Sequence, residues 1–385
     1  MNESQNNRWL HRFAVLTAVA TLALIGIGGL VTSHGAGMSV PDWPTSYGYN
    51  PFLLPLSKWW HVGNVFYEHS HRLFASGVGF LTTILMVWLW IKDPRKWMKW
   101  LGVAAFLAVV LQGVLGGLRV ILFKDQIGIF HATLAQLFFV LTCAIAMFTS
   151  QWWTRSAEIR NPPTSRDSAS PHNGKPSVAG LGNPSAIRNP VPAPARKLQR
   201  LFLFTAFLIL FQLILGATMR HQHAGLSISD FPLAHGKLWP ATDPASVARY
   251  NEDRIEITSV NPITAFQIQL QMVHRIVALL ILAAVAACAW RARRTGLAKP
   301  AAFWLCLIVG QAALGAATVL SDKAADIATA HVLVGALSLA TGAILSIVAV
   351  RLPQFVVSAA AENALAGSSG AKIDAAGHVS AAHRA

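Results

Sequence analysis

The stretch "YEHSHRLFASGVGFLTTILMVWLW", residues 67–90, places a carboxylate, histidines and an arginine directly before an almost unbroken apolar run. Such a run, of about 20 residues, is long enough to cross the roughly 30 Å hydrocarbon core of a bilayer as a helix. In lipid the backbone groups must be satisfied within the segment, so a helix is the expected structure. The ionisable residues then lie at the mouth of the span, where charged groups are costly unless they have a partner or a task.

The composition extends this interpretation to the whole chain. Of its 385 residues 54% are hydrophobic and 12% charged, and a soluble protein carries about twice that charged fraction. Eight apolar stretches of about 19 to 24 residues are each long enough to span a bilayer. They cover approximately residues 13–33, 73–91, 101–122, 127–150, 201–219, 268–290, 301–320 and 327–350. The sequence therefore predicts an all-α membrane protein with eight transmembrane helices.

The formal net charge of +15 mostly reports topology. If the N-terminus is cytoplasmic and the spans alternate, lysine and arginine gather on the cytoplasmic side, whereas the long outer loop 220–265 balances its basic residues with acidic ones. This is the positive-inside pattern, and it places both termini in the cytoplasm. It also argues against nucleic-acid binding. With no leader of the kind used for organelle import, a bacterial cytoplasmic (inner) membrane is the simplest location.

Two segments interrupt the apolar pattern. Residues 155–199 and the end of the chain are rich in small and polar residues with almost no large apolar side chain, so neither can bury a core. We predict an N-terminal bundle over 1–154, a flexible cytoplasmic linker over 155–199, a C-terminal bundle over 200–352 and a disordered cytoplasmic tail over 353–385.

Without the linker, the two halves of the chain resemble each other. The matched segments are HGAGMSVPDWP (34–44) with QHAGLSISDFP (222–232), EHSHR (68–72) with QMVHR (271–275), LQGVLGG (111–117) with GQAALGA (310–316), and GIFHATLAQL (128–137) with ATAHVLVGAL (328–337). Each half contains four spans in the same order. We therefore predict two repeated four-helix bundles in tandem.

Four histidines fall on matched positions: His71 with His274, and His131 with His331. His71 and His131 lie near the outer ends of two parallel helices in one bundle, and the other two do so in the second bundle. Facing imidazoles at equal depth suit bis-histidine ligation of haem iron. Interhelical hydrogen bonding is the alternative for any single histidine. Zinc is less favoured, because each pair lacks further ligands.

The residues around these histidines differ between the halves. Arg72 and Arg275 follow His71 and His274, where a guanidinium can pair with a haem propionate or can simply extend to the interface. Glu68 lies three residues before its histidine, whereas Gln271 takes that place in the other half. A buried carboxylate with a neutral counterpart points to chemistry in the first half. Pairing of Glu68 with Arg72 is the structural alternative.

With these motifs in place, the chain resembles the haem A synthase family over about residues 10–352, apart from the linker. The resemblance implies oxidation of a methyl group of haem O to a formyl group, which gives haem A for cytochrome oxidases. It implies haem B as a cofactor held by His274 and His331, with a substrate haem flanked by His71 and His131. Glu68 would then be the catalytic carboxylate.

The resemblance also implies partners: a haem O synthase, the cytochrome oxidase assembly machinery and a membrane electron donor that the sequence does not identify. A homo-oligomer is left open. Some bacterial members carry a cysteine pair in the first outer loop, and residues 34–48 contain none. The competing functions are a diheme b-type electron-transfer protein, which gives no reason for Glu68 to differ from Gln271, and a proton channel or transporter, which needs polar groups through the bilayer depth.

Overall fold

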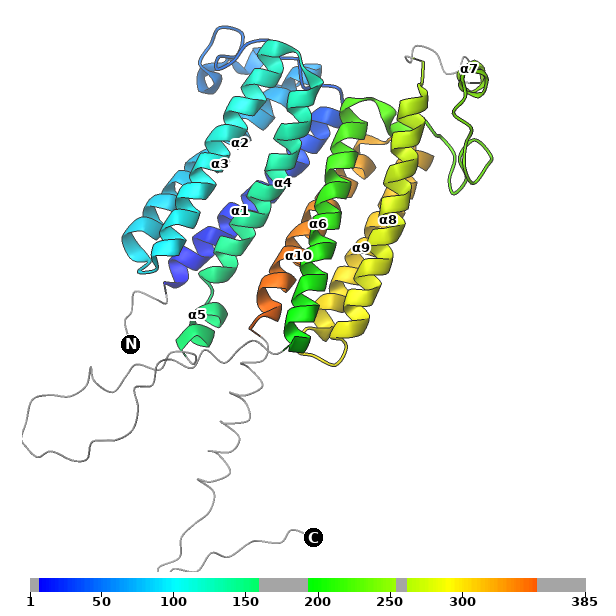
Figure 1. Cartoon of the computed structure of the whole chain (residues 1–385). Coiled ribbons are helices and arrows are strands. Elements are labelled where there is room, and N and C mark those ends of the chain that lie inside the picture. The colour runs from blue at the N-terminus through cyan, green and yellow to red at the C-terminus, as the bar shows by residue number, and fades with distance from the viewer. Residues whose placement is uncertain (1–6, 159–192, 254–261, 352–385) are drawn as a thin grey trace, which may run out of the picture.

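The computed structural model describes residues 7–158, 193–253 and 262–351, and Figure 1 shows long helices lying side by side. Eight of the helices in this part of the chain are long and apolar enough to cross a membrane. They are α1 (Arg8–Ser33), α2 (Gly63–Lys92), α3 (Lys96–Leu122), α4 (Asp125–Phe148), α6 (Ala193–His221), α8 (Ala265–Ala292), α9 (Ala298–Leu320) and α10 (Ala325–Ala349). The prediction of an all-α membrane protein with eight spanning helices is confirmed.

The helices begin earlier than the apolar runs suggested, most clearly in α2. Its predicted span starts at residue 73, but the helix already starts at Gly63. The whole of "EHSHR" therefore lies within the helix rather than at its mouth. Apolar runs show where lipid begins, whereas a helix continues through polar residues as long as other parts of the chain satisfy their side chains.

The helices form two groups that pack against each other. In the first, α1 contacts α2 and α4, and α3 contacts α2 and α4; in the second, α6, α8, α9 and α10 contact one another in the same cyclic manner. Helices α1 and α4 pack on α6 and α10 between the groups (Figure 1). Ile25, Phe139 and Ala336 are buried in the shared core. The two histidine-bearing halves are thus joined along an apolar seam.

Short helices mark the two ends of the bundle. Residues 34–62 and the helix α7 (Pro244–Glu252) lie at one end, here called the loop end, and α5 (Gln151–Glu158) lies at the other, here called the α5 end (Figure 1). The short 3₁₀ helices η2 (Pro51–Leu53), η3 (Leu56–Lys58) and η4 (Ala224–Leu226) belong to the loops. The four matched histidines all lie toward the loop end of their helices.

Large apolar side chains on the outside of the bundle are the surface that lipid would cover. Phe80 and Leu279 are 67% and 68% exposed in the bare protein. Inside, Trp304 is fully buried and donates a hydrogen bond from Nε1 to the carbonyl of Ser338 at 2.8 Å. The polar end of the indole is satisfied, as a buried tryptophan requires.

The predicted linker is shorter at both ends than residues 155–199, because α5 extends to Glu158 and α6 begins at Ala193. The remainder, 159–192, and the predicted tail over 353–385 lie outside the described residues.

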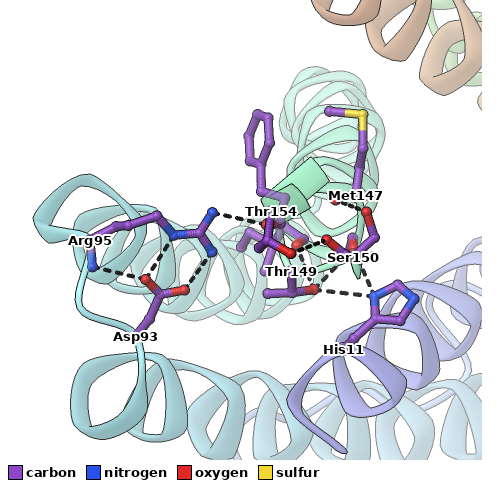
Figure 2. Close-up of polar contacts among 10 residues, drawn as sticks. His11, Asp93, Arg95, Met147, Thr149, Ser150 and Thr154 are labelled. Atoms are coloured by element: carbon purple, nitrogen blue, oxygen red, sulfur yellow. Dashed lines mark hydrogen bonds and ion pairs between the residues drawn. The ribbon is translucent and has the colours of Figure 1, made fainter. Parts of the chain in front are cut away.

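A polar junction closes the α5 end of the first group of helices (Figure 2). Asp93, in the turn between α2 and α3, accepts hydrogen bonds from Nε and Nη2 of Arg95 at 2.9 and 2.6 Å. Nη1 of Arg95 donates to the carbonyl of Phe148 at the end of α4. Nδ1 of His11, from α1, lies 3.0 Å from the carbonyl oxygen of Ala146. The junction therefore connects all four helices of the first half.

We expect Asp93→Asn to weaken this junction, because Asp93 is buried and holds Arg95 in place to bind α4. The free energy of unfolding should fall by about 2 kcal/mol, in the range for hydrogen bonds to charged groups. Chemical unfolding in detergent measures it. The control Lys92→Ala, at an exposed neighbour, should change it by less than about 0.5 kcal/mol. Equal effects of the two substitutions would contradict the role of the junction.

Candidate functional site

The structure brings the predicted histidines together in pairs. His71 on α2 and His131 on α4 lie within electrostatic range of each other, and so do His274 on α8 and His331 on α10. All four are enclosed by protein, yet each keeps some accessible surface. Each pair therefore lies in the interior of its group of helices.

A glycine on the preceding helix lies against each imidazole. A Cβ added at Gly28 of α1 would lie 3.1 Å from Cε1 of His71, and one added at Gly315 of α9 would lie 3.1 Å from Cε1 of His331. Gly116 and Gly216 lie against the other two rings, with distances of 3.3 and 3.5 Å. The same contact occurs four times; a Cβ would be tight against the ring at Gly28, Gly116 and Gly315 and in ordinary contact with it at Gly216.

The ring nitrogens are available to a ligand at most of these histidines. Nδ1 of His71, His131 and His274 is buried with no hydrogen-bond partner among the described residues. His331 differs, since its Nδ1 lies 3.1 Å from the carbonyl oxygen of Gln311. A carbonyl acceptor at Nδ1 fixes the tautomer in which Nε2 carries the lone pair, and here Nε2 of His331 lies 3.4 Å from Nε2 of Gln311.

The residues present fit a haem in each half. Imidazole nitrogens are good axial ligands for haem iron, and glycines beside the rings leave room for a flat macrocycle. In the described part of the chain, no three His, Cys, Asp or Glu side chains gather as a metal cluster. A pair of histidines supplies only two ligands, so a porphyrin would have to provide the rest of the coordination.

Glutamines fix the helices that carry the histidines. Nε2 of Gln112 on α3 donates to the carbonyl of His131, and Nε2 of Gln212 on α6 donates to the carbonyl of His274, at 3.0 and 2.9 Å. These two glutamines lie within the spanning helices, and their hydrogen bonds go to the backbone of the histidines. They do not form a polar path across the bundle.

Glu68 is 4% exposed and holds the loop before α2. Its Oε2 accepts a hydrogen bond from the backbone N–H of Val40, and its Oε1 accepts one from Nη2 of Arg72, both at 2.8 Å. In the other half Gln271 makes the matching contact, because its Oε1 accepts from the backbone N–H of Ile228 at 2.8 Å. Its Nε2 also donates to the carbonyl of Ile228 at 3.1 Å. A neutral amide thus performs the same loop contact as the carboxylate.

The side chains of Arg72 and Arg275 donate hydrogen bonds to backbone carbonyls of the loops. Nη1 of Arg72 donates to the carbonyls of Asp42 and Thr45, and Nη2 donates to Val40 and Glu68. All four Nη hydrogens of Arg72 are therefore used within the protein. Arg275 makes two matching contacts, from Nη1 to the carbonyl of Leu233 and from Nη2 to that of Asp230.

The aspartates of these loops are held ionised. Burial acts to raise the pKa of Asp42, but hydrogen bonds from Gly48, Thr45 and Tyr47 hold it below its usual range. The pKa of Asp230 is lowered in the same way: burial opposes the shift, and bonds from the backbone of Gly236 and His235 outweigh it. Each aspartate stabilises a turn of its loop through these hydrogen bonds. The arginine of the same half, Arg72 or Arg275, donates hydrogen bonds to backbone carbonyls of that loop.

The sequence reasoning overlooked two cations beside the histidines, Arg119 and Arg220. The charge of Arg119, on α3, acts on both His71 and His131. That of Arg220, on α6, acts on His331. Arg119 stands in an apolar run, in "GGLRVIL", and Arg220 directly follows one, in "GATMRHQ"; a charge within or at the end of a membrane span is itself a signal of function.

The fold and the site define a polytopic membrane protein with a pair of facing histidines in each half. The chain matches the family COX15-CtaA, cytochrome oxidase assembly protein, over residues 11–342, and it belongs to that family. Its relatives include proteins named heme A synthase from Shouchella clausii (26% identical, covering 83% of this chain and 89% of the relative) and from Rhizorhabdus wittichii (25%, 86% and 91%). Another, from Chelativorans sp., is 25% identical over 85% of this chain and 87% of its own length.

The matched loop contacts predict opposite outcomes for two substitutions. Gln271→Ala leaves the N–H and carbonyl of Ile228 buried without their partners, so hydrogen exchange of the Ile228 amide should rise by about tenfold or more. Glu68→Gln keeps an acceptor for Val40, so the Val40 amide should stay protected. Amide exchange followed by mass spectrometry measures both. Unchanged exchange at Ile228 would contradict the loop role of Gln271.

Proposed function

We propose that this chain is a haem A synthase, which oxidises a methyl group of haem O to a formyl group in two successive hydroxylations. The first gives an alcohol, and the second gives a hydrated aldehyde that loses water. The substrate haem lies between His71 and His131, and a resident haem B lies between His274 and His331. Membership of the oxidase assembly family and the names of the relatives support haem O and haem A as substrate and product.

The observation that carries the catalytic assignment is the contrast between Glu68 and Gln271. Both hold a loop amide at 2.8 Å, and both are nearly inaccessible, at 4% and 2% exposure. A neutral amide is therefore sufficient for the loop contact, while a carboxylate and its arginine partner carry a desolvation cost at this depth. Apart from its ion pair with Arg72, the charge of Glu68 is available for chemistry, and Glu68 lies one turn from His71.

The residues of the first half have distinct roles in this reaction. His71 and His131 hold the substrate macrocycle by its iron and so fix the position of the methyl group relative to Glu68. Glu68 is the base for attacking water or stabilises positive charge that develops on the methyl carbon. Arg72 keeps the carboxylate in one position through its bond to Oε1. Each hydroxylation with water removes two electrons and two protons from the substrate and water together, and a haem B in the second half would pass these electrons one at a time to a redox partner in the membrane.

An electron-transfer cytochrome with two permanent b-type haems is the other function compatible with the histidines. It explains the four imidazoles and their glycines equally well. It leaves the charge of Glu68 only its ion pair with Arg72, and the relatives are named for synthesis of haem A. The enzyme is therefore the better proposal.

The setting of the reaction follows from the same proposal. The enzyme would lie in a bacterial cytoplasmic membrane with both termini inside, receive haem O from a haem O synthase and pass haem A to the oxidase assembly machinery. The histidine pairs and Glu68 would then lie toward the outer face, because the loop end is opposite to α5 and the N-terminus (Figure 1).

The decisive experiment is haem extraction from detergent-purified protein that is co-expressed with a source of haem O. Wild type should yield haem B and haem A, identified by chromatography and mass. Glu68→Gln should accumulate haem O, with haem A reduced by about a hundredfold or more. Haem B alone in both proteins, at two per chain, would identify an electron-transfer cytochrome. Because Glu68→Gln preserves the acceptor for Val40, loss of product in a folded variant reports on chemistry.

The glycine contacts give a matched pair of substitutions on α9. A Cβ at Gly315 would lie 3.1 Å from the His331 ring, whereas one at Gly310 meets no atom within 4 Å. Gly315→Ala should displace the imidazole and weaken binding of haem B by roughly tenfold, for a steric cost of about 1.4 kcal/mol. Gly310→Ala should leave it unchanged. Absorbance titration of the two variants measures the difference, and equal affinities would count against ligation by His331.

A further inference from the structure

Two cations lie near each other at the loop end of the second half, and one of them, Arg220, lies within electrostatic range of His331. Arg220 lies near the end of α6, and Lys323 lies in the turn between α9 and α10. The charge of Arg220 acts on both His331 and Lys323. Nη2 of Arg220 donates to the carbonyl of Gly29 and to Oγ of Ser33, both on α1, at 2.9 and 2.8 Å. The guanidinium is thus fixed in position between the two halves.

No acidic side chain among the described residues neutralises this pair. The ion pairs in that part of the chain are Glu68 with Arg72 and Asp93 with Arg95. Nε of Arg220 is buried with no hydrogen-bond partner there. Burial, and then the charge of Arg220, lower the pKa of Lys323. Two half-buried like charges are unfavourable unless an anion joins them.

We propose that Arg220 and Lys323 bind the carboxylates of the porphyrin held between His274 and His331. This assignment rests on the proposed function of the second half as a haem B site. Haem B carries two propionates on one edge, and the free N–H groups of a fixed guanidinium are well suited to a carboxylate. Arg275, the sequence candidate for this role, uses both Nη atoms on loop carbonyls.

The arginine near the histidines lies on α6 in the second half and on α3 in the first, and these helices do not correspond in the repeat. The position of Arg220 corresponds to Thr32 in the first half, and the position of Arg119 corresponds to Thr318 in the second. Both threonines donate their hydroxyl to the carbonyl four residues earlier in their own helix. Arg119 therefore lies near the histidines of the first half and Arg220 near His331 of the second, on helices that do not correspond in the repeat.

The test compares a porphyrin with and without its carboxylates. The full chain carrying His71→Ala and His131→Ala keeps only the second site, and it is titrated in detergent with ferric protoporphyrin IX and with its dimethyl ester. Adding Arg220→Gln should weaken binding of the acid by about tenfold or more and that of the ester by less than about twofold. Lys323→Gln should act in the same direction, and both effects should shrink as salt rises.

Controls separate the charge from the contact with α1. Ser33→Ala removes a hydrogen bond of Arg220 but keeps its charge, and should preserve the preference for the acid over the ester. Arg119→Gln, beside the deleted site, should also preserve it. Equal losses for acid and ester in Arg220→Gln would overturn the proposal and leave Arg220 a structural residue. If the parent binds neither porphyrin, the haem B site itself fails, which is a distinct result.

A second measurement keeps all four histidines in place. Removing a positive charge near a haem stabilises its oxidised form, so Arg220→Gln should lower the midpoint potential of the second-half haem in an equilibrium redox titration. Arg220→Lys should restore most of the potential because it keeps the charge. An unchanged potential in Arg220→Gln would overturn the proposal even where the histidine-deleted background does not fold.

Discussion

The structure depends on satisfying polar groups at a depth where water is scarce. Each half inserts an ordered loop over its histidines, and a buried side chain of the following helix holds that loop by its backbone: Glu68 through Val40, and Gln271 through Ile228. Without these contacts, the loop amides and carbonyls would be buried and unpaired, at a cost of about 1 to 3 kcal/mol each.

This constraint also explains why similar sites can differ in chemistry. Because a glutamine and a glutamate hold the same loop amide, the two halves keep one architecture while only one carries a buried carboxylate. A neutral site is suited to retaining a cofactor. A site with a fixed carboxylate beside its histidine is suited to acting on what it binds. The seam between the halves then places both sites in a single rigid frame, with Arg220 bonded across it to α1.

Much of this protein could be predicted from its sequence. Hydropathy located the eight spanning helices, since a helix that crosses lipid must be apolar over about 20 residues. Internal repetition paired His71 with His274 and His131 with His331, and the structure places the members of each site near each other. The helix starts were less accurate: α2 begins at Gly63, because its polar first turns are stabilised by loops that hydropathy does not reveal.

What the sequence by itself determined is the class of protein, the order of its spans and the histidines that face one another, because these follow from local apolarity and from spacing along helices. Only the tertiary structure decided which cations serve the loops and which face the histidines. Arg72 binds Asp42 and Thr45 from another segment, and Arg220 reaches Gly29, 191 residues away. Such contacts depend on how the helices pack, and no pattern within one span encodes them.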